Sequence, residues 1–404
     1  MKRFFNILAL AIVVISLCAC NHETGYDGSD DTIKIPITPQ TGDYIFFDID
    51  RISRGALLEG TLKADFNVIG YRYATDAWEY AKSQASQSRQ FSFLNNNGET
   101  TTEQMGVFNN HPLTVKWDGV VHEYDDKGSL DSPYDGNLRQ WEKNLRYAFF
   151  GWYPTTLTLN GDNKNLKFEG EPYISYSLPD GGSVDARKAM VDVLTASDID
   201  TYKAKSMSVV FEMQHRLAAL DIHASHMITA KALKDSYDDW DGVDDTASVT
   251  VTVNSVELKL DNIYKKVDIY LNPEAVILKE GVEYVGHYPS GSYTPTFEFG
   301  DVGVSFGYNE EKSLVPSNEK LILIPQNDVI ATISTITYTV TCGGISRAFT
   351  STHNVAEDRD YSTTVPLVEG HYAYLLLTIT KSGLFVKVEQ APTWEEKKVE
   401  YEFE

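Results

Sequence analysis

The chain has 404 residues, of which 42% are hydrophobic, and 35 Lys and Arg residues stand against 58 Asp and Glu, so the formal net charge is −23. A strongly acidic chain without a dense run of Lys or Arg is unsuited to neutralising phosphates, and we predict no nucleic-acid partner. The length, with 24 Tyr and 18 Phe, supports sizeable packed cores and excludes wholesale disorder. Three cysteines are too few for a disulfide framework.

The N-terminus predicts export and lipid attachment. Residues 1–19 combine a short cationic start with an apolar run that is too short to span a bilayer as a stable helix. Leu17, three residues before Cys20, and Ala19, directly before it, resemble the lipobox of bacterial lipoproteins, whose cysteine is acylated after the leader is removed. We therefore predict a signal peptide over residues 1–19 and palmitate-type acylation on Cys20, which would anchor the chain to a membrane. Cys18 fits this pattern less well, and the alternative is an ordinary leader cut near Ala19.

Residues 20–33 follow as a polar, acidic segment without apolar periodicity. Such a composition cannot bury enough apolar surface to fold, so we predict a flexible tether between the lipid and the folded body.

The body from residue 34 onward has the pattern of an all-β protein. Short runs carry apolar residues at every second position, which is typical of half-buried strands, and turn residues separate the runs. The clearest runs are Tyr44–Asp48, Phe66–Tyr71, Tyr147–Trp152 and Tyr173–Ser177. Helical pattern is scarce and is confined to Ala74–Ser88 and Ile228–Ser236. Many strands with few helices predict antiparallel β-sandwiches rather than a parallel α/β sheet.

Two further features concern the organisation of the body. The polar stretch 196–207 is the predicted domain boundary, which divides the body into β-sandwich domains at 34–200 and 201–404. In Val249–Val253 the apolar residues fall on odd positions, whereas in Val256–Leu260 they fall on even positions. The slip at Asn254-Ser255 predicts a β-bulge or a tight corner.

Several segments occur in an order that resembles the fimbrillin-like (Mfa-like) lipoprotein pilins and adhesins of the Bacteroidota, which supply type V pilus subunits. Each segment alone is a weak signal, and their order along most of the mature chain carries the resemblance. The segments are Tyr44–Phe47, Arg51–Ala56, Asp65–Tyr71, Val107–Asn110, Leu113–Val115, Trp141, Tyr147–Pro154, Asp192–Leu194, Val209–Ala218, Leu323–Gln326, His371–Leu377 and Trp394.

The resemblance implies two tandem transthyretin-like, Greek-key β-sandwich domains in a subunit exported to the outer membrane. It also implies that a protease cuts near the first strand and that the vacated groove accepts a strand from another subunit. On this reading Tyr44, Ile45, Phe46, Phe47 and Ile49 belong to the removable first strand. Removal of an edge strand would expose unpaired backbone groups beside an apolar groove, which is a template for another strand.

Arg54, which precedes Gly55, is the preferred cleavage site, and Arg51 is the alternative. The competing interpretation is that both arginines are solvated loop residues. Near the C-terminus Val399, Tyr401 and Phe403 alternate with Glu, a pattern that fits a short donor strand. The same segment fits a final sandwich strand, in which case the subunit would be a tip, an anchor or a non-polymerising adhesin.

Residues that suggest catalysis or metal binding have simpler explanations. His215, His223 and His226 lie close together, but no Cys or carboxylate at a familiar spacing completes a zinc set, so we interpret them as structural histidines. The acidic run 238–245 lacks both acids that an EF-hand loop requires at its ends and is predicted to be a solvated loop. Cys342 lies in a strand pattern and is expected to be a small buried residue.

We therefore predict a lipid-anchored fimbrial subunit or adhesin without catalytic residues, metal or cofactor. Its expected partners are other pilus subunits or copies of itself, the outer membrane, and host or bacterial surface ligands. The first alternative is a surface glycan-binding lipoprotein, in which Trp78, Trp117 and Trp240 would stack on sugar rings. A secreted hydrolase is the second alternative and has only generic support, because no spacing singles out a nucleophile.

Overall fold

The computed structural model describes residues 47–53, 62–74, 93–94, 100–101, 105–108, 112–119, 122–124, 141, 145–160, 172–201, 209–272, 276–279, 282–316, 319–353 and 361–390. Within these ranges the chain is mostly β-structure, with two short α-helices and one 3-10 helix. The predicted fold class, all-β sandwiches with few short helices, is confirmed.

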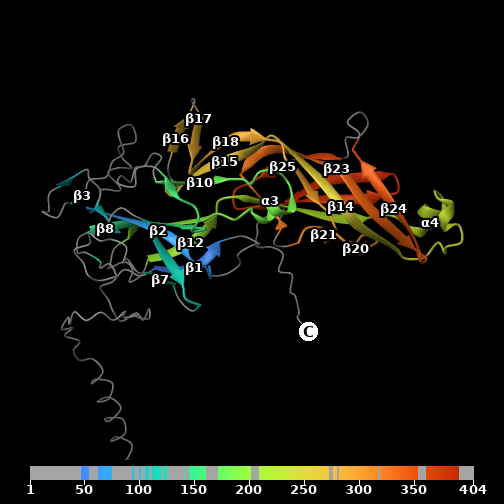
Figure 1. The fold of residues 1–404 in the computed structure, drawn as a ribbon, viewed down its shortest axis with the longest axis horizontal. Coiled ribbons are helices and arrows are strands. Elements are labelled where there is room, and N and C mark those ends of the chain that lie inside the picture. Colours follow the sequence, from blue (N-terminus) through green and yellow to red (C-terminus); the bar gives the residue numbers. More distant parts are fainter. Residues whose placement is uncertain are drawn as a thin grey trace, which may run out of the picture. The chain divides into compact units, whose positions relative to one another are not determined.

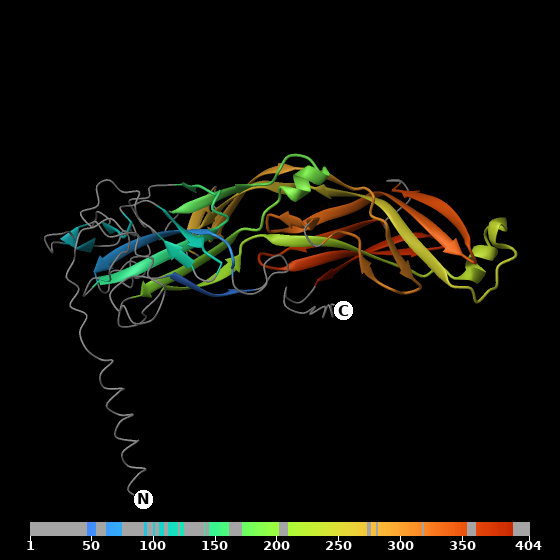
Figure 2. The same ribbon diagram turned by 60° about the horizontal axis from the view of Figure 1, so that its bottom comes forward.

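The first sheet contains the N-terminal edge strand. Its order is β1 (Phe47–Ser53), β12 (Val209–His215), β11 (Leu194–Thr201), β8 (Leu145–Tyr153), β2 (Phe66–Ala74), β6 (Leu113–Trp117) and β7 (His122–Tyr124), and β5 (Met105–Gly106) also pairs with β2. In both views the blue β1 lies beside the green β12 at one edge of the sheet (Figures 1 and 2). β1 runs parallel to β12, whereas the other pairs of this sheet are antiparallel.

The two faces of the first sheet pack against different cores, because successive side chains of a strand point to opposite faces. Along β8, Tyr147 and Phe149 belong to one core, whereas Phe150 and Trp152 belong to the other. The smaller core also receives Phe47 from β1. The first strand is therefore part of a core that the rest of the sheet shares.

A second sheet shares the larger core with the other face of β8. Its order is β18 (His287–Tyr293), β15 (Ile263–Tyr270), β10 (Tyr173–Ser177) and β9 (Leu159–Asn160). Ile174, Val267 and Ile269 from this sheet join Phe150 and Trp152 in that core.

Two further sheets form the C-terminal sandwich around the same core. One contains β21 (Lys312–Ser313), β13 (Ala218–His226), β26 (Tyr372–Thr380), β27 (Gly383–Gln390) and β22 (Leu321–Leu323). The other contains β19 (Thr296–Phe299), β14 (Val249–Asp261), β23 (Gln326–Cys342), β24 (Ile345–Thr352), β20 (Val304–Gly307) and β25 (Ser362–Leu367). Two hairpins, β3 (Phe93–Leu94) with β4 (Thr100–Thr101) and β16 (Val276–Lys279) with β17 (Val282–Val285), complete the described strands.

Two chain segments pass from one sandwich to the other with almost no interruption. Only residues 216 and 217 separate β12 from β13, and only Asn262 separates β14 from β15. Asn262 has a φ of 57°, a left-handed conformation that Asn tolerates better than most residues. The side chain of Gln326 holds this corner, because its Oε1 accepts from Tyr264 N at 2.6 Å and its Nε2 donates to Asn262 O at 3.1 Å.

The predicted slip in β14 is confirmed as a register shift. Val253 pairs with Tyr338 and Ser255 pairs with Thr337, so Asn254 is the extra residue of a bulge. Its carbonyl instead accepts from Val302 N at 3.0 Å. In both views the yellow β14 lies beside the orange β23, its antiparallel partner over most of its length (Figures 1 and 2).

The helices are short. The predicted helix over Ile228–Ser236 is found as α4 (Ala230–Lys234), capped by Thr229, whose side chain accepts from Ala232 N at 3.2 Å. The structure adds α3 (Val184–Lys188) and the 3-10 helix η1 (Asp238–Trp240). Of the helix predicted over Ala74–Ser88, Ala74 is the last residue of β2 and residues 75–88 lie outside the described ranges. None of the described helices has the length and apolar character to cross a membrane.

Strand pairing crosses the predicted domain division of 34–200 and 201–404 in two places. β12, beyond residue 201, pairs with β11 and β1 of the first sheet. β10, before residue 200, pairs with β15. The residues of β12 and β15 are thus bonded to strands of the first half, and the chain passes into the C-terminal sandwich after His215.

Candidate functional site

The edge strand β1 has one sheet partner among the described strands. Its backbone pairs with β12 from Phe47 opposite Val209 to Ser53 opposite Gln214, with a register shift between Ile49 and Arg51. An edge strand with one partner is bonded to the sheet along one side only, so its release breaks a single ladder.

Phe47 fills an aromatic pocket of the smaller core. Its side chain is 1% exposed, and its ring lies 5.4 Å from that of Phe149, 5.9 Å from that of Phe211 and 6.1 Å from that of Phe108, measured between centroids. The ring of Phe211 is stacked on Phe47, and that of Phe149 meets it edge-on, which are favourable arrangements for aromatic pairs. We call these three rings the Phe47 pocket.

Two glycines allow the rings of this pocket to lie close to the backbone. A Cβ added at Gly70 in β2 would lie 2.5 Å from the ring of Phe149, and one added at Gly151 in β8 would lie 3.0 Å from the ring of Phe211. The absence of side chains at these two positions therefore shapes the pocket.

The sequence-predicted site residues are only partly within the described ranges. Phe47, Ile49 and Arg51 lie in β1. In the β1–β12 ladder the backbone of Arg51 lies opposite that of Glu212. The remaining predicted residues lie outside the described ranges, namely Cys20, Tyr44, Ile45, Phe46, Arg54, Val399, Tyr401 and Phe403.

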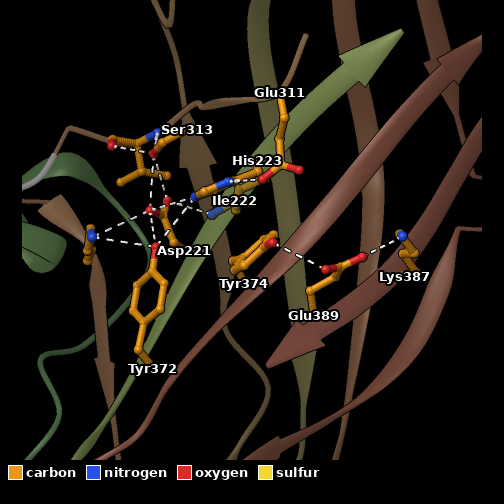
Figure 3. A network of polar contacts seen from close by, with 11 residues as sticks. Asp221, Ile222, His223, Glu311, Ser313, Tyr372, Tyr374, Lys387 and Glu389 are labelled. Carbon is orange, nitrogen blue, oxygen red and sulfur yellow. Dashed lines mark hydrogen bonds and ion pairs between the residues drawn. The ribbon is translucent and has the colours of Figure 1, made fainter. Parts of the chain in front are cut away.

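A second group of polar residues surrounds Asp221 in β13 (Figure 3). Asp221 is 1% exposed, and its carboxylate accepts from Tyr372 OH at 2.7 Å, from Ser313 Oγ at 3.0 Å and from Ile222 N at 2.7 Å. Lys320 Nζ lies 3.7 Å from the same carboxylate. These donors come from four separate chain segments, so the group ties β21, β26 and the chain before β22 to β13.

The electrostatics of this group favour a charged Asp221. Burial opposes the ionised carboxylate, but hydrogen bonds from His223 and Tyr372 and the charge of Lys320 outweigh it, so the pKa of Asp221 lies below its usual value. Burial and the neighbouring Asp221 carboxylate raise the pKa of the Tyr372 hydroxyl, which keeps it protonated and able to donate. The arrangement stabilises a buried anion.

The three predicted structural histidines have separate partners. His215 Nδ1 contacts a carboxylate oxygen of the buried Asp192, and His223 Nδ1 lies 2.8 Å from Glu311 Oε1. His226 Nδ1 accepts from Ile228 N at 3.2 Å. Across the described part of the chain, no group of three or more His, Cys, Asp or Glu side chains is placed to hold a metal ion.

The acidic run 238–245 is partly folded rather than wholly solvated. Its first residues form η1, which buries Trp240 completely against Phe349 and Tyr237. Asp239 forms an ion pair with Arg347 at 2.7 Å, and Asp245 forms one with Lys234 at 2.8 Å. Two carboxylates of the run thus have individual cationic partners.

The burial of Trp240 also corrects one residue of the glycan-binding alternative. A side chain at 0% exposure cannot stack on a sugar ring. Trp117 is half-buried in β6, and Trp78 lies outside the described ranges. Cys342 is 1% exposed, as predicted, and burial raises the pKa of its thiol.

Sequence reasoning missed the Asp221 group and the partners of Phe47. Asp221 and Tyr372 are 151 residues apart, and parallel pairing of β13 with β26 brings them together. No local spacing marks such a contact.

Comparison with known proteins identifies the family. A model of the fimbrillin-like family matches residues 82–392, more than half of the chain. The chain belongs to the fimbrillin-like family. No curated protein matches this fimbrillin-like chain.

Solved structures similar to this fimbrillin-like protein include several from Bacteroides species. A fimbrial protein from Bacteroides vulgatus is 16% identical, with 87% of this chain and 99% of that chain covered and a TM-score of 0.49. A candidate cell adhesion protein from Bacteroides ovatus is 12% identical, with coverage of 87% and 95% and a TM-score of 0.39. Another from Bacteroides uniformis is 15% identical, with coverage of 88% and 99% and a TM-score of 0.36.

Proposed function

We propose that this protein is a lipid-anchored fimbrial subunit or cell-surface adhesin of the outer membrane that assembles by strand exchange. Removal of the N-terminal strand near Arg54 would open the acceptor site, and a strand of another subunit would fill it. The observation that carries the proposal is that β1 is an edge strand with one described partner, β12, and with Phe47 buried in a core.

The position of Arg51 within β1 favours Arg54 as the cleavage site. A protease needs an extended backbone that is not engaged in a sheet, and the backbone of Arg51 is paired with that of Glu212 inside β1. Arg54 itself lies outside the described residues. A cut after Arg54 would free the whole strand, whereas a cut after Arg51 would leave Ile52 and Ser53 on the sheet side of the break.

Loss of β1 would create an acceptor with both polar and apolar features. The edge of β12 that now pairs with β1 would present unpaired backbone groups over Val209–Gln214. The Phe47 pocket would be left without the ring of Phe47 that fills it. Filling the pocket again with an aromatic side chain contributes about 1.5–3 kcal/mol from burial alone. Tyr401 and Phe403 are the aromatic residues of the proposed donor segment.

Cleavage and assembly are tested together on the soluble body, residues 21–404. We expect treatment with an Arg-specific protease to produce a ladder of oligomers that resists detergent in unheated samples and disappears on heating. Arg54→Lys should abolish the ladder while the charge is kept. Arg347→Lys, which changes an arginine in β24, is the matched control. A ladder that persists in the Arg51→Lys and Arg54→Lys double variant would contradict the proposal.

Lipid attachment is tested by labelling cells with a palmitate analogue. We expect label on the wild-type protein and on Cys18→Ser, but not on Cys20→Ser. Label that survives Cys20→Ser would contradict anchoring at Cys20.

A further inference from the structure

The outer face of the sheet β18-β15-β10-β9 carries a group of tyrosines that belongs to neither main core. The inner face of this sheet contributes Ile174, Val267 and Ile269 to the larger core. Because side chains alternate along a strand, the residues between them point away from that core. On this outer face Tyr270 is surrounded by Tyr173, Tyr288 and, from β17, Tyr284.

In these four residues, which we call the tyrosine patch, three tyrosines pack against Tyr270. The rings of Tyr173 and Tyr270 lie 5.2 Å apart, and those of Tyr284 and Tyr288 lie 5.1 Å apart in an edge-to-face arrangement. Tyr270 is 6% exposed, and the other three rings are half-buried around it. A buried centre with half-exposed rings at its border is a preorganised aromatic surface that needs little ordering before it binds a ligand.

Polar groups border the patch on the same sheet face. Register places Tyr173 opposite Tyr270 and places Ser175 and Tyr288 on either side of Asp268. Ser175 Oγ donates to Asp268 Oδ1 at 2.6 Å, and Asn160 Nδ2 donates to Ser175 Oγ at 3.1 Å. The rings therefore lie directly beside a fixed row of carboxylate, hydroxyl and amide groups, which can exchange hydrogen bonds with hydroxyls of a ligand.

Size and charge narrow the class of ligand. Three neighbouring strands span about 10 Å, a width that matches one or two sugar rings. A stable protein interface needs a larger surface, of roughly 800 Å² per partner. The formal net charge of the chain is −23, so an anionic ligand would be repelled. Rings for stacking, beside acceptors and donors for hydroxyls, suit a neutral carbohydrate.

We propose that the tyrosine patch, with Asp268, Ser175 and Asn160, is a binding site for a neutral glycan. Pyranose rings would stack on Tyr173 and Tyr288 while their hydroxyls bond to the polar row. The site lies on a sheet that does not contain β1, so it is independent of strand exchange. It also differs from a site built on Trp78, Trp117 and Trp240.

The test begins with an array of immobilised neutral and acidic oligosaccharides, probed with the uncut soluble body. The neutral glycan that binds best is then titrated in solution. We expect Tyr288→Ala and Tyr173→Ala each to weaken binding at least tenfold, Asp268→Asn to weaken it several-fold, and Tyr173→Phe, which keeps the ring, to stay within about threefold. The control is Tyr308→Ala, which removes a tyrosine that is 58% exposed elsewhere. Thermal melts verify that each variant is folded.

Each other outcome overturns the proposal. The proposal is wrong if the protein binds none of the neutral glycans. It is also wrong if binding survives both tyrosine-to-alanine changes in folded protein. A preference for acidic glycans contradicts the charge argument. Patch variants that lose self-association on size-exclusion chromatography without any glycan effect would show a protein interface instead.

Discussion

Asp221 is a buried charge whose stability depends on its donors. Its carboxylate accepts hydrogen bonds from Tyr372 OH and Ser313 Oγ, and Lys320 Nζ lies 3.7 Å from it. Removal of one member of such a group leaves a buried charge or polar group without its partner. The free-energy cost of that loss is commonly larger than the net stabilisation that the intact group provides.

We predict that Asp221→Asn lowers the free energy of unfolding at pH 7 by about 2–4 kcal/mol. The pKa of Asp221 is lowered in the folded state, so its contribution is present above the unfolded-state value of about 3.9 and is lost as pH falls through the folded value. Urea unfolding at pH 7 and at pH 3 measures both effects, and the two proteins should differ less at pH 3. Asp245→Asn, in an exposed ion pair, is the control and should change little. Equal stabilities at pH 7 would contradict the argument.

Gly70 and Gly242 form a matched pair for a second prediction. A Cβ at Gly70 would meet the ring of Phe149, whereas one at Gly242 would have no atom within 4 Å. We expect Gly70→Ala to destabilise the protein by about 1–3 kcal/mol through overpacking. Gly242→Ala should be neutral within about 0.5 kcal/mol. Thermal melts compare the two, and similar effects of both changes would show that the ring of Phe149 can move aside.

At the scale of elements, β1 links stability to cleavage. We predict that Phe47→Ala lowers the free energy of unfolding of the uncut protein by about 3–5 kcal/mol, because a buried ring is replaced by a cavity. After cleavage and loss of β1, the variant and the wild type should be equally stable. Val210→Ala, on the half-exposed face of the partner strand, is the control. A difference that persists after cleavage would mean that the strand stays in place.

The sequence allowed strands with a local apolar pattern to be predicted, but it did not show which strands pair with one another. Alternation with period two predicts the strands at 66–71, 147–152 and 173–177 and the bulge at Asn254, because each depends on neighbouring residues. The parallel partner of β1 is about 160 residues away, and no local pattern encodes it. α3 was missed because it is five residues long and is held by Arg187, which donates to the carbonyl oxygen of Glu298.

At the scale of the whole molecule, the family was evident from the order of weak motifs, and the fold class was evident from many short strands with few helices. The passage between the two sandwiches was not, because Arg216 and Leu217 carry no turn signal. The tyrosine patch was missed for a related reason, since its members come from four strands and only sheet register brings them together.

Assembly supplies the prediction that belongs to this scale. We expect Tyr401→Ala with Phe403→Ala to reduce the heat-sensitive ladder of the cleaved protein, because an aromatic side chain is needed to fill the Phe47 pocket of the next copy. Glu400→Gln with Glu402→Gln changes the alternate positions and should leave the ladder intact. Gel densitometry at equal protein concentration compares the two pairs. An unchanged ladder in the aromatic variant would exclude this segment as the donor.

The near-continuous runs from β12 to β13 and from β14 to β15 have a mechanical consequence. Tension applied between the first two sheets and the C-terminal sandwich would be carried by covalent backbone, through β12–β13 and β14–β15, and not by noncovalent contacts alone. Strands pulled lengthwise past their neighbours oppose the pull with many ladder bonds at once, whereas strands peeled from one end yield bond by bond. A subunit whose halves are joined by two such backbone connections would keep the halves together under the drag of flowing fluid.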